Sequence, residues 1–144
     1  MSELDLLIRG GTVATASDTV DCDVGIRDGR VALLGKAADM PSAAETIDAT
    51  GLLVLPGGIE AHCHIAQESA TGGMTADDYT SGSISAAFGG NSCFVPFAAQ
   101  HRGMGVTETL DLYDRRAIGH SVIDFGYHLI VADPTEKALD RKSV

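Results

Sequence analysis

The chain has 144 residues and a formal net charge of −10, since 20 Asp and Glu outnumber 10 Lys and Arg. Hydrophobic residues make up 44% of the sequence and charged residues 21%, a balance that suits a folded globular protein and excludes wholesale disorder. The acidic balance and the lack of a Lys/Arg cluster argue against binding to nucleic acid or to an anionic membrane surface.

The first third of the chain predicts short β-strands. A hairpin is expected between Cys22–Arg27 and Arg30–Leu34, because Asp28-Gly29 favours a tight turn. The Ala-rich stretch Lys36–Glu45 predicts a loop. Other strands are expected at Leu6–Ile8, Thr12–Thr15, Thr46–Asp48 and Leu52–Leu55, the last two with the spacing of a hairpin around Ala49–Gly51.

The pattern changes at Pro56-Gly57-Gly58, after which strands and helices alternate. Strands are predicted at Ile59–Ile65, Ser92–Phe97 and Ser121–Val131. Helices are predicted from a Thr75 cap to about Phe88, from a Thr107 cap to Gly119, and onward from Asp133–Glu136. This alternation implies parallel strands with right-handed crossovers. Because parallel sheets are normally covered on both faces, we expect the chain to be the N-terminal part of a larger protein.

Targeting and cysteine patterns indicate a cytoplasmic protein. No stretch approaches the roughly 18 apolar residues of a membrane span, and the acidic start Met1–Asp5 is not typical of a signal peptide. Cys22, Cys63 and Cys93 are widely spaced and form no C-x-x-C pair, so reduced thiols are expected rather than a zinc ribbon or a disulfide framework.

The segment Gly57–His64, GGIEAHCH, carries the strongest chemical signal. His62 and His64 stand at positions i and i+2 of a predicted strand, so both imidazoles would point to one face and could reach one metal ion. At the C-terminal end of the first strand of a parallel barrel, that face is where active sites lie. The alternative is a chance pair of half-buried strand histidines with backbone partners.

The surrounding sequence resembles the amidohydrolase superfamily. In that superfamily a strand with a Pro-Gly turn runs straight into an H-x-H metal pair, as Ile47–His64 does here, and Ile8–Val13 is similar to its N-terminal strands. The dihydropyrimidinase/hydantoinase branch is resembled further downstream by Gly73–Tyr79, Gly82, Ala86-Ala87, Gly89-Gly90 and Asp124–His128. The resemblance covers nearly the whole chain and is specific for the branch rather than for one substrate.

Two related branches fit less well, and two positions depart from the pattern. Dihydroorotases usually place Arg where this chain has Ala66, and allantoinases tend to carry Asn where it has Gln67. Glu60 stands where the branch usually has Asp, which puts the geometry behind the metal ligands in question. Cys63 replaces a common Thr and should point away from the histidine face, as a packing residue.

The resemblance implies an α/β fold, namely the N-terminal part of a TIM-like (β/α)8 metal-dependent hydrolase barrel preceded by strands of a small composite β-sandwich domain. Residues 1–56 would supply the sandwich strands, and residues 57–144 the first three β/α units. A complete barrel needs roughly 250 residues, so the barrel in this chain would be truncated.

The resemblance also implies a reaction. Family members hydrolyse a cyclic amide C–N bond, as in dihydropyrimidines and hydantoins, with two divalent metals, usually zinc, that share a hydroxide. His62 and His64 would bind the more buried metal of this binuclear site. The bridging carboxylated lysine, two more histidines and the catalytic Asp are expected beyond Val144, since Lys137 and Lys142 fall in the predicted third helix. Catalytic zinc needs about three protein ligands, so we expect the fragment alone to be inactive.

The expected partners follow from the same family. They are a small cyclic amide or ureide substrate and further copies of the chain in a tetramer or dimer, with no nucleic acid and no membrane. The loop Ile65–Met74 is expected to help shape the substrate pocket, with Gln67 and Glu68 as its polar candidates. The alternative is an ordinary flexible loop.

The remaining candidates have structural interpretations. His101 and His120 are expected at the surface, with a place at the barrel mouth as the alternative for His101. His128 is expected to be a hydrogen-bonded core histidine, with a metal ligand facing the barrel interior as the alternative, and Asp124 is expected to be a buried structural carboxylate. Four aromatic residues on strands predict core positions, namely Phe94, Phe97, Phe125 and Tyr127.

Two other classes of function stay open at this point. The first is a non-catalytic dihydropyrimidinase-like assembly protein, which keeps the fold and loses the metal ligands. Retention of both His62 and His64 speaks against it. The second is a self-contained small α/β binding domain, which would require the chain to fold cooperatively as a monomer.

Overall fold

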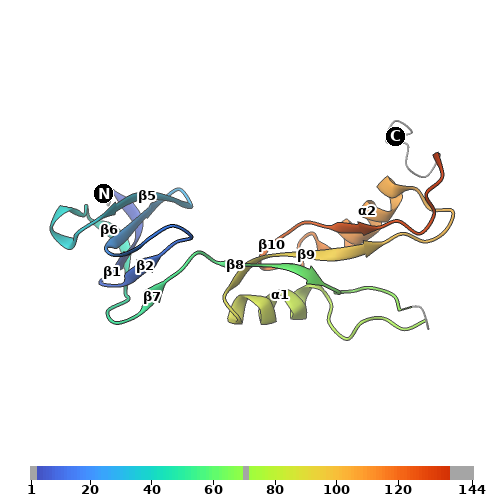
Figure 1. Cartoon of the computed structure of the whole chain (residues 1–144), viewed down its shortest axis with the longest axis horizontal. Coiled ribbons are helices and arrows are strands. Elements are labelled where there is room, and N and C mark those ends of the chain that lie inside the picture. The colour runs from blue at the N-terminus through green and yellow to red at the C-terminus, as the bar shows by residue number, and fades with distance from the viewer. Residues whose placement is uncertain (1–2, 70–71, 137–144) are drawn as a thin grey trace. The chain divides into compact units, whose positions relative to one another are not determined.

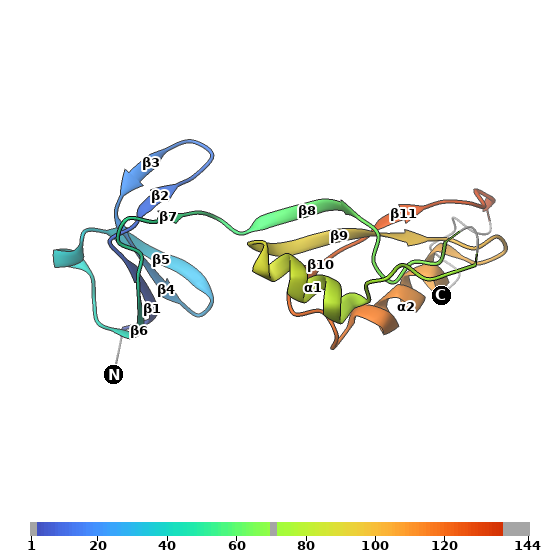
Figure 2. The ribbon, with the colours of Figure 1, turned by 90° about the horizontal axis from the view of Figure 1, so that it is seen from below.

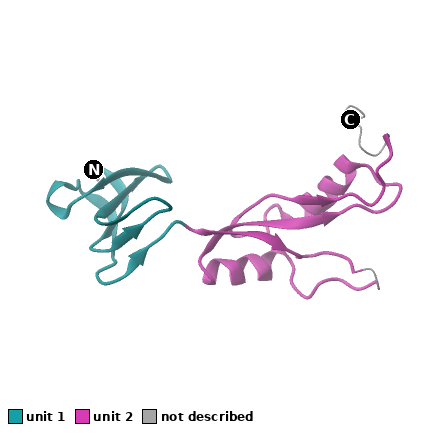
Figure 3. Ribbon diagram, in the orientation of Figure 1, with its two compact units in different colours: residues 1–56 teal, residues 57–144 magenta. Residues whose placement is uncertain are grey.

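A computed structural model describes residues 3–69 and 72–136 of the chain. The chain divides into two compact units, residues 1–56 and residues 57–144 (Figure 3). Within the described ranges, no helix is both long enough and apolar enough to cross a membrane.

The first unit is built from two small sheets. The larger sheet has the strand order β5-β4-β1-β6, and its members are β1 (Leu4–Arg9), β4 (Asp23–Arg27), β5 (Arg30–Gly35) and β6 (Ala43–Asp48). The predicted hairpin is confirmed, because β4 and β5 pair antiparallel around Asp28 and Gly29. Both turn residues have positive φ, 52° and 68°, as a tight hairpin turn whose twist matches its strands requires.

The first unit differs from its predicted structure in three respects. The smaller sheet has the order β3-β2-β7, formed by β2 (Thr12–Ala14), β3 (Thr19–Asp21) and β7 (Leu53–Val54), of which β3 was not predicted. The predicted hairpin between residues 46–48 and 52–55 is wrong, because β6 pairs parallel with β1 whereas β7 pairs parallel with β2. The predicted loop 36–45 contains the short 3-10 helix η1 (Ala37–Asp39) and the start of β6.

The second unit contains parallel strands with helices between them (Figure 1). The elements are β8 (Gly58–Cys63), α1 (Tyr79–Phe88), β9 (Asn91–Ala99), α2 (Val106–Ala117), β10 (Asp124–Phe125) and β11 (His128–Ile130). β8, β10 and β11 all pair parallel with β9, which confirms the predicted alternation. The predicted third strand is interrupted at Gly126-Tyr127 and forms two short pieces.

Both helices begin at residues other than those predicted. Asp78 caps α1 in a capping box with Ser81, in which each side chain accepts a hydrogen bond from the other residue's backbone N–H. Thr75 does not cap the helix, because its hydroxyl accepts a hydrogen bond from the backbone N–H of Gln67 instead. Helix α2 is capped by Gly105 rather than Thr107. The predicted third helix, with Lys137 and Lys142, lies almost wholly outside the described residues.

The core of the second unit lies between the sheet and the two helices, both of which pack on one face of the sheet (Figure 2). Its buried members include Phe94 and Ala98 from β9, Tyr79 from α1, and Tyr113 and Ala117 from α2. The sheet residues that point away from this core are therefore on the face that the helices leave open. That face carries the histidines.

Candidate metal centre

Strand β8 and the residue that follows it present two imidazoles on the open face of the sheet. The ring centroids of His62 and His64 lie 5.7 Å apart, and the planes of the two rings meet at 71°. Both rings pack against Phe97 of β9, at centroid distances of 4.7 and 5.0 Å. The prediction that Phe97 is a core residue is therefore wrong. Phe97 lies outside the core beneath the helices, and its ring packs against both histidines. Phe94 is in the core, and Phe125 and Tyr127 pack against it.

The backbone of β8 is irregular where the histidines begin. Between its pairings with β9, β8 advances from Glu60 to Cys63 while β9 advances only from Phe94 to Pro96, so β8 holds one extra residue. Such a bulge leaves backbone groups without ladder partners and re-aims the side chains near it.

Side chains satisfy two of the backbone groups in this bulge. The carboxylate of Glu60 accepts a hydrogen bond from the backbone N–H of His62 at 2.8 Å. The Nε2 of His128, in β11, lies 3.0 Å from the carbonyl oxygen of Ala61, and since a carbonyl can only accept, Nε2 carries the proton. Glu60 and His128 thus hold the bulge from which His62 projects.

His64 has a side-chain partner of its own. Its Nδ1 lies 2.6 Å from Oε1 of Gln67, three residues further along the chain. Because the amide oxygen accepts, Nδ1 donates and Nε2 is left with its lone pair. A ligating histidine commonly donates its other ring N–H to such an acceptor, which fixes the orientation of the ring.

Cys63 lies between the two histidines but packs on the opposite side, against the core of the unit. Burial, followed by the negative charge of Glu60, raises the pKa of the Cys63 thiol above its usual value. A neutral thiol is a poor metal ligand, because thiolate is the binding form. The prediction that Cys63 is a packing residue is therefore consistent with its position.

The histidine pair fits a metal ion as part of a larger ligand set. Two imidazoles on one tetrahedral zinc, with Zn–N bonds of about 2.0 Å, place their ring centroids about 5 Å apart, close to the observed spacing. Within residues 3–69 and 72–136, no cluster of three or more His, Cys, Asp or Glu could hold a metal. This part of the chain accordingly offers two candidate ligands, one fewer than a catalytic zinc site normally takes from its protein.

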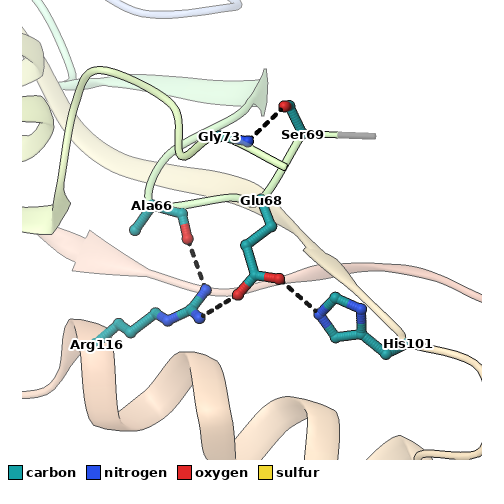
Figure 4. Close-up of polar contacts among 6 residues, drawn as sticks. All are labelled: Ala66, Glu68, Ser69, Gly73, His101 and Arg116. Atoms are coloured by element: carbon teal, nitrogen blue, oxygen red, sulfur yellow. Dashed lines mark hydrogen bonds and ion pairs between the residues drawn. The ribbon is translucent and has the colours of Figure 1, made fainter. Parts of the chain in front are cut away.

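The loop after β8 is tied to α2 and to the loop that follows β9 (Figure 4). Nη2 of Arg116 lies 3.1 Å from Oε1 of Glu68, and Nε2 of His101 lies 3.2 Å from Oε2 of the same carboxylate. Nη1 of Arg116 donates to the carbonyl oxygen of Ala66 at 2.7 Å. Glu68, predicted as a polar candidate of the pocket, thus has both of its oxygens engaged within the chain.

The other singled-out residues have mixed outcomes. His120 is exposed, as predicted, and His101 is half-exposed and paired with Glu68. His128 makes the expected hydrogen bond, but it lies on the open face and is exposed rather than in the core. Asp124 is also exposed, so the prediction of a buried carboxylate is wrong for this chain.

Sequence reasoning missed two residues that organise the site. Arg116 carries no local signal, because its partners Ala66 and Glu68 lie 50 and 48 positions earlier in the chain. The local signal for Gln100 is only its place as a polar residue directly after the apolar strand β9. It is buried, and its amide oxygen accepts from the backbone N–H groups of Ala132 and Asp133.

No family model matches the chain. A curated D-hydantoinase from Geobacillus stearothermophilus is 40% identical over 134 residues, which are 93% of this chain and 28% of the relative. A solved D-hydantoinase structure superposes with a TM-score of 0.87 at 39% identity, over 94% of this chain and 29% of the other. The chain is homologous to the D-hydantoinases. A dihydropyrimidinase structure from Brevibacillus agri is similar as well, with a TM-score of 0.84 at 38% identity, over 90% of this chain and 28% of that chain.

The homology extends over a limited part of these enzymes. The chain spans between 28% and 30% of the length of four curated D-hydantoinases that it matches. Its two units and mixed α/β fold therefore correspond to part of a D-hydantoinase and not to the complete enzyme.

Proposed function

We propose that this chain supplies the first metal-binding strand of an enzyme that hydrolyses the C–N bond of a cyclic amide. The observation that carries the proposal is the pair His62 and His64, which lie at the end of β8 on the open face of the sheet and pack against Phe97. Active sites of parallel barrels lie at the C-terminal ends of their strands, which is where this pair stands. The homology to D-hydantoinases supports the same class of reaction.

The proposed architecture follows from the strand pattern. Residues 57–144 would form the first three β/α units of a TIM-like (β/α)8 barrel, and residues 1–56 would contribute strands to a small β-sandwich domain. The parallel pairing of β8, β10 and β11 with β9, with helices on one face, supports the first part. Exposed apolar side chains such as Leu52, Leu53 and Leu55 support a further covering of the first unit.

The proposed cofactor is a divalent metal, zinc in a binuclear site. Bound metal would polarise the ring carbonyl and lower the pKa of the attacking water. His62 and His64 would hold the metal, with Nε2 as the ligating atom of His64 because Nδ1 is engaged by Gln67. The third protein ligand, the bridging lysine and the catalytic Asp would come from later strands.

The residues of this chain would mainly position the ligands. Glu60 and His128 hold the bulge of β8 through the backbone of His62 and Ala61. Gln67 and Glu68 were predicted to contact the substrate, but their side-chain oxygens contact His64, Arg116 and His101. We therefore give both residues a positioning task beside the substrate.

The proposed partners are a small cyclic amide or ureide and further copies of the same protein in a dimer or tetramer. Nucleic acid and membranes are not proposed, since the chain carries a net charge of −10. The proposed location is the cytoplasm, because all three cysteines of the chain are free thiols.

The test compares this chain with a longer protein that also carries the later barrel strands. Both are loaded with zinc and assayed for ring opening of hydantoin and dihydrouracil. We expect turnover by the longer protein, its loss in His62→Ala and His64→Ala, and no turnover by the 144-residue chain. Turnover by the short chain would contradict the requirement for later ligands. A longer protein that binds no zinc and hydrolyses neither ring would favour the non-catalytic assembly protein.

A further inference from the structure

Arg116 of α2 contacts the residues on both sides of Gln67. Nη1 donates to the carbonyl oxygen of Ala66 at 2.7 Å, and Nη2 contacts the Glu68 carboxylate at 3.1 Å (Figure 4). The guanidinium carbon also lies 5.1 Å from the centroid of the Tyr113 ring, on the same helix. The planar guanidinium group lies over an aromatic ring and therefore has few alternative positions. The residues that it contacts are fixed relative to α2.

A second group holds Glu68 from another part of the chain. Nε2 of His101 contacts the carboxylate oxygen that Arg116 does not use. The turn that carries His101 is itself fastened, because Gln100 donates to the carbonyl oxygen of Met104 at 2.7 Å and Gly103 donates to Asp133 at 2.9 Å. Glu68 thus connects α2 with the turn that carries His101.

Gln67 lies between the two residues that Arg116 contacts. It connects these contacts to the candidate metal centre. Its backbone is fixed by Thr75, which donates its N–H to the Gln67 carbonyl oxygen and accepts the Gln67 N–H at its hydroxyl. Its side-chain oxygen then reaches Nδ1 of His64 at 2.6 Å. An unbroken series of contacts therefore leads from Arg116 to the His64 ring.

We propose that Arg116 and Glu68 are positioning residues that hold Gln67 so that His64 keeps its proton on Nδ1 and offers Nε2 to the metal. The hydrogen bond at one imidazole nitrogen decides which nitrogen is left for ligation. The metal consequence rests on the function proposed above, whereas the tautomer of His64 is a property of the chain itself.

The first test measures that tautomer by ¹H–¹⁵N correlation of the imidazole nitrogens in the metal-free 144-residue chain. At about pH 8.5, imidazole side chains are generally neutral. We expect His64 to be in the Nδ1–H form, and Arg116→Met to shift it to a mixture of tautomers. Arg115→Met is the matched control, since Arg115 is the exposed neighbour on the same helix, and it should leave the signals unchanged.

A second variant covers the case in which Arg116→Met fails to fold. The Glu68 side chain is 44% exposed, so Glu68→Ala should fold and should also weaken the Nδ1–H signature. The proposal is overturned if His64 of the unaltered chain carries its proton on Nε2. It is equally overturned if Gln67→Ala changes the tautomer whereas Arg116→Met and Glu68→Ala, both folded, do not.

The second test uses the longer, metal-binding protein. Loss of a group that orients a ligating histidine typically costs about 10- to 100-fold in metal affinity, and we expect that loss in Arg116→Met but not in Arg115→Met. Zinc affinity is measured by competition with a chromophoric chelator. A tautomer that responds in the short chain, together with a longer protein that binds no zinc, would refute the proposed function and leave the positioning role standing.

Discussion

His128 in β11 donates a hydrogen bond from Nε2 to the carbonyl oxygen of Ala61 in β8, at 3.0 Å. The two residues are 67 positions apart in the chain, and the His128 ring also lies 5.2 Å from the ring of Phe97. Three imidazoles, those of His62, His64 and His128, thus surround one phenyl ring on the open face of the sheet. Through its hydrogen bond, His128 holds the backbone from which His62 and His64 project.

Replacing His128 by Ala should leave the Ala61 carbonyl without this donor. We expect a loss of about 1 kcal/mol in the free energy of unfolding, the usual net contribution of one hydrogen bond. Urea denaturation followed by circular dichroism measures it. His120→Ala is the control, because His120 is an exposed histidine after α2. Equal stability of the two variants would show that the contact between His128 and Ala61 contributes nothing.

Glu60 should contribute through its acceptor oxygen rather than through its charge, because it accepts the backbone N–H of His62 at 2.8 Å. Glu60→Ala removes the acceptor, whereas Glu60→Gln keeps an amide oxygen of similar reach. We expect Glu60→Ala to cost about 0.5 to 1 kcal/mol at this exposed position and Glu60→Gln to cost less. If the His62 amide hydrogen exchanges faster in Glu60→Ala alone, the lost stability comes from the hydrogen bond to this N–H. The same exchange rate in both variants would contradict the prediction.

Acid should weaken the start of α1. The hydrogen bond from the backbone N–H of Ser81 holds the pKa of Asp78 below its usual value, so ionised Asp78 stabilises the folded chain above the unfolded pKa of about 3.9. This contribution is lost as the pH falls through the lower, folded pKa. Asp78→Asn keeps a capping side chain that does not titrate. Below about pH 4 the unfolding midpoint should therefore fall more steeply in the unaltered chain, and parallel acid profiles would refute this prediction.

Gly82 stands where α1 closely approaches the residue that follows the histidine strand. A Cβ at Gly82 would lie 2.9 Å from Cδ1 of Ile65, a distance at which one of the two groups must move. Because Ile65 is itself buried in the core, we expect Gly82→Ala to destabilise the fold by about 1 to 3 kcal/mol through overpacking, even though alanine favours helices. Ser85→Ala, at an exposed position of the same helix, is the control and should differ little from the unaltered chain. Thermal melting of both variants decides, and a more stable Gly82→Ala would show that Ile65 moves aside freely.

Local patterns were enough to predict those elements whose signals lie in adjacent residues. The hairpin at Asp28-Gly29 follows from the positive φ that its turn requires, and the alternation after Pro56 follows from apolar runs separated by capping residues. The pairing of β6 with β1 and of β7 with β2 could not be predicted in this way. Hairpin spacing is a local signal, whereas the choice of a partner strand depends on which sheet covers which apolar face.

The same division holds for the candidate site. His62 and His64 could be read from the sequence, because alternation along a strand places residues i and i+2 on one face. Their surroundings were decided by tertiary structure alone. Phe97, His128 and Arg116 reach the site from β9, β11 and α2, and a register shift in β8 creates the backbone groups that Glu60 and His128 satisfy. Contacts between residues 50 or more positions apart arise only when the folded sheet brings its strands and helices together, so the sequence by itself determined the candidate ligands and the fold determined what orients them.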